Sequence, residues 1–352
     1  MFLVILYSIL LISGMVCSQA VNLSSIKPGL DLITKICLAY IMIGVGLEFI
    51  IDKKRLKNYG FDFLFAFLAA ALPWILCAVY FAMVFKTNWN HALLIGVFAA
   101  PTSAGVLFAM LAAAGLKKTW VFQKAQVLAV FDDFDAILLL IPLQIAFIGL
   151  RPELFVVVAG ILALLSTAYF KLNSWKTPHG QGWMVFYSIM MVTLVELVKA
   201  YGQIDLGVLL PSFVLGAVIY YEHNAINGDR PFLFDQIIKA LFIFLVGCSL
   251  PKMAVAHVNA GILACHVAAL TVLSNLGKCF LFFCYKKEAG WKDRLALSVA
   301  MFPRGEVGAG VLFIALGYGL EGVAMNAAGL SLGLNLCLTG LFIMIVKRLQ
   351  KA

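Results

Sequence analysis

Three aspartates lie close together in a stretch of sequence that is otherwise apolar. The segment VFDDFDA contains Asp132, Asp133 and Asp135, and ILLLIPLQIAFIGL follows it directly. On a helix, Asp132 and Asp135 share a face, while Asp133 lies about 100° around the axis. An ionised side chain at the centre of a bilayer costs about 2.5–3.5 kcal/mol, so such residues face a bundle interior or a water-filled cavity. We therefore expect this helix to line a polar cavity; the alternative is a central helix that holds structural ion pairs.

A lysine in another apolar segment is the natural partner of these carboxylates. Lys278 lies deep within TVLSNLGKCFLFFCY and eight residues before Lys286, which is about 12 Å along a helix. A buried lysine without a carboxylate would lose its proton or move its helix to the interface. We expect Lys278 to pair with Asp132 or Asp133, and the alternative is that its side chain reaches the membrane surface.

Two further segments contain residues that interrupt helices. GVFAAPTSAGVLF carries Pro101, Thr102 and Ser103, and VAMFPRGEVGAGVLF carries Pro303 and three glycines. Each segment should kink or unwind near the middle of the membrane. Non-helical backbone at that depth persists only where it is buried in protein or lines a cavity. Interrupted helices at corresponding places in two halves of a chain are typical of a transporter's binding site, whereas ordinary proline kinks are the simpler alternative.

A few other ionisable side chains lie within or beside these segments. Arg304 and Glu306 fall in the second interruption, where they would form an ion pair that holds the irregular backbone or part of an ion path. Glu48 ends the motif GLE near one mouth of the bundle and is a supporting candidate. His266 is the one histidine deep in an apolar segment, and we interpret it as a packing residue.

The elements that carry these residues are those of a membrane protein. Of the 352 residues, 63% are hydrophobic and 12% are charged, with a mean hydropathy of +1.02. We expect one all-α polytopic domain of about 12 transmembrane helices, with inverted repeats in which helices 4 and 11 are discontinuous. The expected spans are residues 1–19, 32–51, 61–85, 91–115, 120–149, 153–171, 181–200, 205–221, 232–250, 258–285, 292–318 and 324–346.

The net charge of +9 follows from membrane topology rather than from nucleic-acid binding. With a cytoplasmic C-terminus, the only loop cations on the outer side are Lys27, Lys86, Arg151, Lys199 and Lys252. The excess of Lys and Arg on the other side predicts that both termini are cytoplasmic. The first segment ends in Ser-x-Ala, which a signal peptidase could cleave, but it lacks a basic start, so we expect a retained helix. The eight cysteines form no CxxC pair and indicate neither disulfides nor a metal.

Taken together and in order, several motifs resemble the monovalent cation:proton antiporter superfamily. GLEF, APTSAG, VFDDFDAI, LPSFVLGAVI, FIFLVGCSL, LGK and PRGEVG are similar to the electrogenic sodium/proton antiporter and glutathione-gated potassium efflux branch, over about residues 40 to 318. The family's glycine-rich N-terminal segment GxLLAGxxLGP is absent. We expect no nucleotide-binding domain after the last helix, which puts ligand-gated potassium efflux in doubt.

The resemblance implies a fold and a set of roles. It implies a transport core of about residues 61–150 and 258–348, and a dimerisation scaffold of about 1–51 and 153–250, in a homodimer in the bacterial inner membrane. It also implies that helices 4 and 11 cross beside the aspartates. Asp133 would carry the cation, transiently as a Na⁺ ligand, and the proton, and Asp132 would pair with Lys278. Thr102 and Ser103 would lie near the cation.

The chemistry of these residues fits exchange of a cation for a proton. A hard monovalent cation prefers oxygen ligands, and a carboxylate that holds the cation can return protonated and empty of it. For protons to compete near neutral pH, burial and a like-charged neighbour must favour the protonated carboxylate, and the adjacent aspartates should titrate as a coupled pair. We expect antiport of Na⁺, with Li⁺ or K⁺ as alternatives, and no cofactor beyond the transported ions.

Carboxylates inside a membrane are also found in proteins with functions other than antiport. A sodium-coupled solute symporter and a channel are both compatible with intramembrane carboxylates, but the pairing of Lys278 favours antiport. An intramembrane aspartyl protease needs aspartates from two helices and the motifs YD and GxGD. In this chain the aspartates are adjacent, and GVGLE has no aspartate in the corresponding place.

Overall fold

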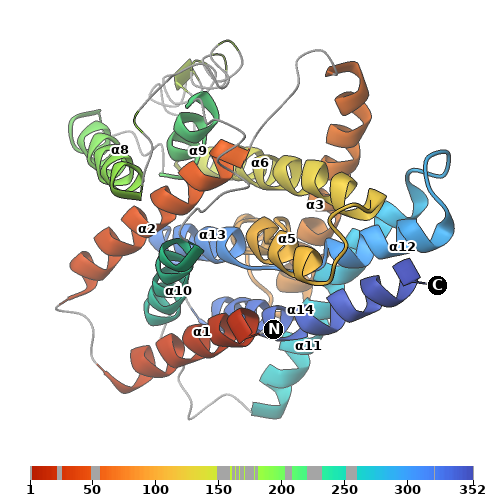
Figure 1. The fold of residues 1–352 in the computed structure, drawn as a ribbon. Helices are drawn as coiled ribbons and strands as arrows, with labels where there is room; N and C mark the ends of the chain where they lie inside the picture. Colours follow the sequence, from red (N-terminus) through yellow and green to blue (C-terminus); the bar gives the residue numbers. More distant parts are fainter. Residues whose placement is uncertain are drawn as a thin grey trace. The chain divides into compact units, whose positions relative to one another are not determined.

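The chain folds into helices that form two compact units. The structure is a computed structural model, and it describes residues 2–21, 26–48, 56–148, 181–202, 208–219, 232–250, 260–320 and 322–351, with isolated positions between 159 and 178. Unit 1 consists of Met1–Asn22, Arg55–Leu143 and Val246–Ala352, and unit 2 consists of Leu23–Lys54 and Gln144–Leu245. Figure 1 shows the helices of both units along the chain.

Unit 1 contains the segments that carry the aspartates, the lysine and the two interruptions. Its helices are α1 (Phe2–Ala20), α3 (Leu56–Val84), α4 (Trp89–Gly96), η2 (Val97–Ala99), α5 (Ala104–Ala113), α6 (Trp120–Ile148, up to Leu143), α11 (Ala260–Lys278), η5 (Cys279–Phe283), α12 (Trp291–Ala300), α13 (Glu306–Gly317) and α14 (Val323–Lys351). The 3-10 helix η5 begins immediately after Lys278, so the helix tightens at that residue.

Both proline-containing segments are interrupted in the structure. In the first, α4 and η2 end before residues 100–103, which are not helical, and α5 begins at Ala104. In the second, residues 301–305 separate α12 from α13. Proline lacks a backbone N–H and clashes with the preceding turn, which accounts for a break at Pro101 and at Pro303. We refer to residues 100–103 and 301–305 together as the crossing.

Glycines allow close approach between the helices of unit 1. At Gly277, one residue before Lys278, a Cβ atom would lie 2.6 Å from Pro73 Cα on α3. At Gly247 a Cβ atom would meet the backbone of α1 at Leu11 and Met15. Ser8 of α1 also donates a hydrogen bond to Gly333 O of α14, at 3.3 Å. The helix α1 thus packs within unit 1, whereas we had expected residues 1–51 to belong to the scaffold.

Unit 2 is built from α2 (Lys27–Glu48), α8 (Gln181–Gly202), α9 (Leu209–Val218) and α10 (Phe232–Ser249, up to Leu245). α2 and α9 touch backbone to backbone, because a Cβ atom at Gly216 would lie 3.0 Å from Gly46 Cα. Ile43 and Leu47 of α2 form a buried aliphatic cluster with Ile219, the residue that follows α9. Such pairs of small residues are a common way for membrane helices to associate.

Five described helices are long and apolar enough to cross a membrane. They are Lys27–Leu47, Gly60–Val84, Gln181–Ala200, Ala260–Phe283 and Val323–Gln350. The structure is all-helical, as the sequence predicted, but the count of about twelve spans stays a prediction. The expected span 153–171 lies largely outside the described residues. α9 is shorter than the expected span 205–221, because the helix ends where Ile219 takes an extended backbone conformation.

Candidate functional site

The two halves of the crossing are joined by hydrogen bonds. The amide of Ser103 donates to Pro303 O at 2.9 Å, and Thr102 Oγ1 donates to Met301 O at 3.0 Å. A Cβ atom at position 305 would lie 2.8 Å from Ser103 Cβ, so only glycine permits this approach. These contacts satisfy backbone groups that the broken helices leave without a partner inside the membrane.

Ser103 and Glu306 form a second link across the crossing. Ser103 Oγ donates to Glu306 Oε2 at 2.6 Å, and both side chains are buried. Glu306 lies in the first turn of α13, where a negative charge interacts favourably with the helix dipole. Ser103 of the first interruption thus holds Glu306, which is the first residue of α13, the helix that follows the second interruption.

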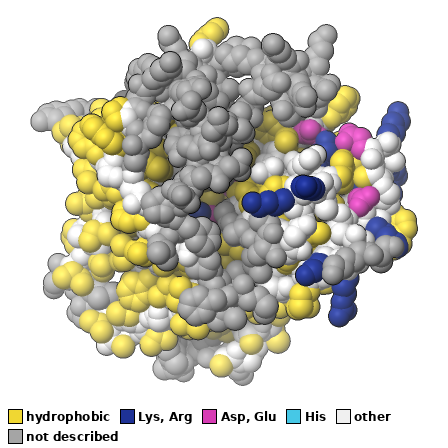
Figure 2. Space-filling model, in the orientation of Figure 1, with side chains coloured by type: hydrophobic (Ala, Val, Ile, Leu, Met, Phe, Trp, Pro, Cys, Tyr) yellow, Lys and Arg dark blue, Asp and Glu magenta, His cyan; other side chains and the backbone are white. Residues whose placement is uncertain are grey.

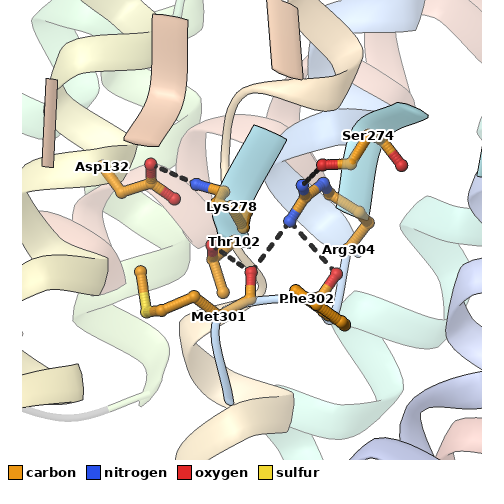
Figure 3. A network of polar contacts seen from close by, with 7 residues as sticks. All are labelled: Thr102, Asp132, Ser274, Lys278, Met301, Phe302 and Arg304. Carbon is orange, nitrogen blue, oxygen red and sulfur yellow. Dashed lines mark hydrogen bonds and ion pairs between the residues drawn. The ribbon is translucent and has the colours of Figure 1, made fainter. Parts of the chain in front are cut away.

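Arg304 binds the carbonyl oxygens at the end of α12. Its Nη1 donates to Met301 O at 3.0 Å and to Phe302 O at 3.1 Å, and its Nη2 donates to Ser274 O on α11 at 3.0 Å. The side chain is only 1% exposed. A cation at a helix C-terminus compensates the partial negative charge of the free carbonyls. Arg304 therefore stabilises irregular backbone and ties it to α11, as Figure 3 shows.

Lys278 and Asp132 form an ion pair buried within unit 1. Lys278 Nζ lies 2.5 Å from Asp132 Oδ1, and neither side chain is exposed to solvent. The pair joins α11 to α6 and lies beside Thr102, Met301 and Arg304 in Figure 3. A buried pair of this kind costs desolvation, and removing one partner is strongly destabilising, by about 3–5 kcal/mol.

The other two aspartates of α6 are equally buried. Asp133 and Asp135 are both 0% exposed, and each interacts electrostatically with Lys278. Asp132 is also influenced by the charge of Arg304. The structure thus brings three carboxylates, one ammonium and one guanidinium together inside unit 1, next to backbone that is not helical.

The remaining predicted residues fall in different places. Pro101 and Pro303 lie in the crossing. Glu48 is the last residue of α2, and its side chain lies outside the described residues. His266 packs between Phe85 and Tyr80, whose hydroxyl lies 2.9 Å from His266 Nδ1.

A cluster of polar residues that the sequence did not reveal lies near the start of α6. Asp62 of α3 accepts hydrogen bonds from Tyr285 Oη at 2.7 Å and from Lys124 Nζ at 3.0 Å, and Lys124 also pairs with Glu288 at 3.1 Å. Burial raises the pKa of the Tyr285 hydroxyl, and the hydrogen bond to Asp62 adds to this effect. In the sequence, Lys124 counts only among the Lys and Arg residues on the side that carries the excess of positive charge. Its position two turns before Asp132 on α6 is the one feature of the sequence that indicates a place inside the helix bundle.

A polar contact between α11 and α14 was also not predicted from the sequence. Asn335 Nδ2 donates to Asn275 Oδ1 at 2.9 Å, and Asn335 Oδ1 accepts from the amide of Arg304 at 3.1 Å. One turn earlier on α11, the hydroxyls of Thr271 and Ser331 are 2.9 Å apart. The asparagine in GLNLCL is isolated in an apolar helix, and this isolation could have identified it.

Comparison with known proteins now assigns the chain to a family. The family model described as "Sodium/hydrogen exchanger, transmembrane" matches residues 4–347. The fold is similar to that of the sodium proton antiporter MjNhaP1 from Methanocaldococcus jannaschii, solved at pH 8, with a TM-score of 0.65 and 14% sequence identity. That match covers 98% of this chain and 92% of the other. A search of curated protein sequences finds no significant match.

The chain belongs to the sodium/hydrogen exchanger family, within the monovalent cation:proton antiporter superfamily. It is therefore a multi-pass membrane protein that exchanges a cation for protons. It is a transporter and not an enzyme, so the aspartyl protease alternative is wrong. The ions are its substrates, and the family needs no cofactor.

Proposed function

We propose that the protein is an electrogenic antiporter that exchanges Na⁺ for protons by alternating access, with Asp133 as the residue that binds both. The observation that carries this proposal is the buried pair of Lys278 and Asp132, which places a second ionisable group beside the aspartate that would bind the cation. A single carboxylate would suffice for one-for-one exchange. An ammonium that can gain and lose a proton next to it allows exchange in which net charge moves.

The proposed cation ligands are oxygens at the crossing and on α6. The Asp133 carboxylate would provide the charge, with the hydroxyl oxygens of Thr102 and Ser103 as neutral ligands. Both hydroxyls donate to other groups, so their lone pairs remain able to coordinate a cation. Na⁺ and a proton would compete for Asp133, so each would leave when the other binds.

Lys278 would set the number of protons that move. In the cation-free state it pairs with Asp132. When a cation enters, Asp132 would turn toward the cation, and Lys278, without its counter-charge in a buried place, would release its proton. With the proton from Asp133, two protons would move against one Na⁺. The resulting transfer of one net charge is what would make the exchange sensitive to membrane potential.

Assembly and orientation are part of the same proposal. We propose that residues of unit 2 form the scaffold of a homodimer and that the polar part of unit 1 is the transport core. We also propose that the protein lies in a bacterial inner membrane with both termini in the cytoplasm. The distribution of charge supports this orientation: Figure 2 shows Lys, Arg, Asp and Glu side chains gathered where α12 and the end of α14 lie in Figure 1.

The proposal is tested by proton flux in proteoliposomes that contain a pH-sensitive dye. Addition of NaCl should dissipate an imposed pH gradient at lower concentrations than LiCl or KCl, and choline chloride should have no effect. A response to KCl alone would reassign the cation. An equal response to choline chloride, or no response to any of the metal salts, would contradict cation/proton exchange.

A further inference from the structure

The peptide group between Pro303 and Arg304, within the crossing, is held from both sides. Its carbonyl oxygen accepts a hydrogen bond from the amide of Ser103 at 2.9 Å, and its N–H donates to Asn335 Oδ1 at 3.1 Å. The peptide bond is planar and trans, so its C=O and N–H point in opposite directions. This one peptide therefore bridges the first interruption and α14, and it cannot rotate without the loss of both hydrogen bonds.

Asn335 also ties the crossing to the helix that carries Lys278. Asn335 Nδ2 donates to Asn275 Oδ1 on α11 at 2.9 Å. Asn275 precedes Lys278 by three residues, so the two side chains are neighbours on the surface of α11. The guanidinium of Arg304 reaches the same part of α11, because its Nη2 donates to Ser274 O at 3.0 Å (Figure 3). The amide of Asn335 thus fixes both the orientation of a peptide in the crossing and its place relative to α11.

A second pair of side chains joins the same two helices without contacting the crossing. The hydroxyls of Thr271 and Ser331 lie 2.9 Å apart, four residues before Asn275 on α11 and Asn335 on α14, respectively. Thr271 Oγ1 also donates to Val267 O of its own helix at 2.8 Å. Among the hydrogen bonds of the described residues, neither hydroxyl binds the crossing. The two pairs therefore separate the association of α11 with α14 from the support of the crossing.

Helix association alone is a weak reason for an asparagine at this place. The side chain of Asn335 is only 1% exposed, and burial of an amide is costly unless its groups are hydrogen-bonded. Hydrogen bonds between the side chains of membrane helices contribute only modestly to stability, and the hydroxyls of Thr271 and Ser331 already provide one. Asn335 supplies in addition an acceptor for a backbone N–H that has no helical partner where the helix is broken.

We propose that Asn335 is a positioning residue for ion exchange: it holds the peptide between Pro303 and Arg304 in the orientation that Ser103 binds. The inference rests on the proposed function, which places the cation beside Thr102 and Ser103. Without Asn335, the N–H of Arg304 has no acceptor, and the peptide can take other orientations in which Ser103 is not held. The apparent affinity for a ligand falls in proportion to the fraction of molecules in the binding-competent arrangement.

The dependence of dye-monitored exchange on NaCl concentration tests this proposal. Asn335→Ala should raise the KM for Na⁺ about tenfold, the effect of one lost hydrogen bond to a buried group. Its maximal rate should stay near that of wild type, as when binding alone is weakened. Ser331→Ala, on the same helix, is the matched control: it should also melt at lower temperature than wild type but keep the wild-type KM. A wild-type KM in Asn335→Ala would show that Asn335 is only structural, and an equal rise in Ser331→Ala would show a general loosening of the helix pair; either result overturns the proposal.

A matched pair of variants on α11 keeps the test decisive if Asn335→Ala does not fold. Asn275→Ala leaves the hydrogen bond of the Arg304 N–H in place, so it should raise the KM in the same direction but by less. Thr271→Val is its control and should keep the wild-type KM. Equal KM values in Asn275→Ala and Thr271→Val would contradict the proposal. Failure of the proposed function is distinguishable, because it would appear as flux that persists in Asp133→Asn, whereas these comparisons can be made with any cation that drives exchange in wild type.

Discussion

In both units, glycines allow helices to approach closely, but the groups buried where the helices meet are apolar in unit 2 and include polar and charged groups in unit 1. In unit 2, Gly46 and Gly216 join the continuous helices α2 and α9, and residues of α2 contribute to a buried aliphatic cluster. In unit 1, Gly305 lies against Ser103 where two helices are broken, and Gly277 lies against Pro73 next to Lys278. The contact in unit 2 requires only that the two helix surfaces are complementary in shape. The contacts in unit 1 must also satisfy free backbone groups and hold charges at fixed places.

The two kinds of glycine contact differ in what they contribute: stability alone in unit 2, and both stability and function in unit 1. Small residues at an apolar contact let helices pack closely and gain van der Waals energy. At the crossing, the close approach brings Ser103 to Glu306 and Arg304 to carbonyl oxygens, and next to Gly277 the ammonium of Lys278 pairs with Asp132. We therefore expect changes in unit 2 to lower stability alone, and comparable changes in unit 1 to alter cation binding or coupling as well.

The largest effect is expected at Asp133. Asp133→Asn removes the proposed binding charge but keeps the size of the side chain, so cation-dependent proton flux should fall to the level of empty liposomes while the protein stays folded. The measurement is dye-monitored flux, with size-exclusion chromatography as the control for folding. Flux like that of wild type would show that another residue binds the cation.

Two glycine variants compare the units directly. Gly277→Ala and Gly46→Ala would each drive a Cβ atom into the backbone of a neighbouring helix, and overpacking of this kind costs about 1–3 kcal/mol. Both variants should melt at lower temperature than wild type. Only Gly277→Ala should also change the KM for the cation, because it displaces the residue before Lys278. Equal changes of KM in both variants would remove the distinction between the units.

A smaller effect is expected at Tyr285. Tyr285→Phe removes the hydroxyl that donates to Asp62, a hydrogen bond to a charged group that is worth about 1.5–3 kcal/mol. The raised pKa of Tyr285 makes this contribution complete below the ordinary tyrosine pKa of about 10 and causes it to decline above that pH. Thermal melts of wild type between pH 7 and about 11 should show the decline, and the variant should lack it. Parallel curves for the two proteins would refute the role of the hydroxyl.

The smallest effect is expected for a partly exposed ion pair of unit 2. Lys35 Nζ lies 2.5 Å from Glu196 Oε1, with side chains that are 29% and 39% exposed. Pairs of this kind contribute about 0–1 kcal/mol. Glu196→Gln should therefore leave the flux and its dependence on Na⁺ unchanged. A loss of transport in this variant would extend the functional site into unit 2.

The sequence predicted the parts of the structure that depend on local chemistry. Prolines and glycines indicated the interruptions at Pro101 and Pro303, and the depth of Lys278 in its segment indicated that it needs a carboxylate. Contacts between segments that are distant in the sequence were harder to predict. Asp62, Lys124 and Tyr285 come from three separate segments, and nothing in their local sequence relates them. The packing of α1 within unit 1 depends on Gly247, a single small residue in another helix.

The roles within the aspartate group were the least predictable. Adjacent aspartates on a helix point in different directions, and the direction that faces Lys278 depends on how α6 and α11 are rotated. The residues alone left Asp132 and Asp133 as equal candidates, and the family resemblance favoured Asp132. For Asp135 the sequence predicts only that it shares a helix face with Asp132, because its complete burial is a property of the folded chain.

The most direct test of the account is the response of exchange to membrane potential in wild type and in Lys278→Gln. Moving one net charge through 100 mV is worth about 2.3 kcal/mol. In liposomes with an imposed potassium diffusion potential, Na⁺-driven proton flux through wild type should follow the potential, and flux through Lys278→Gln should be weakly affected or independent of it. The variant should also be less stable, by about 3–5 kcal/mol, because Asp132 loses its partner. If flux through both proteins follows the potential equally, Lys278 is a structural residue and the two-proton mechanism is wrong.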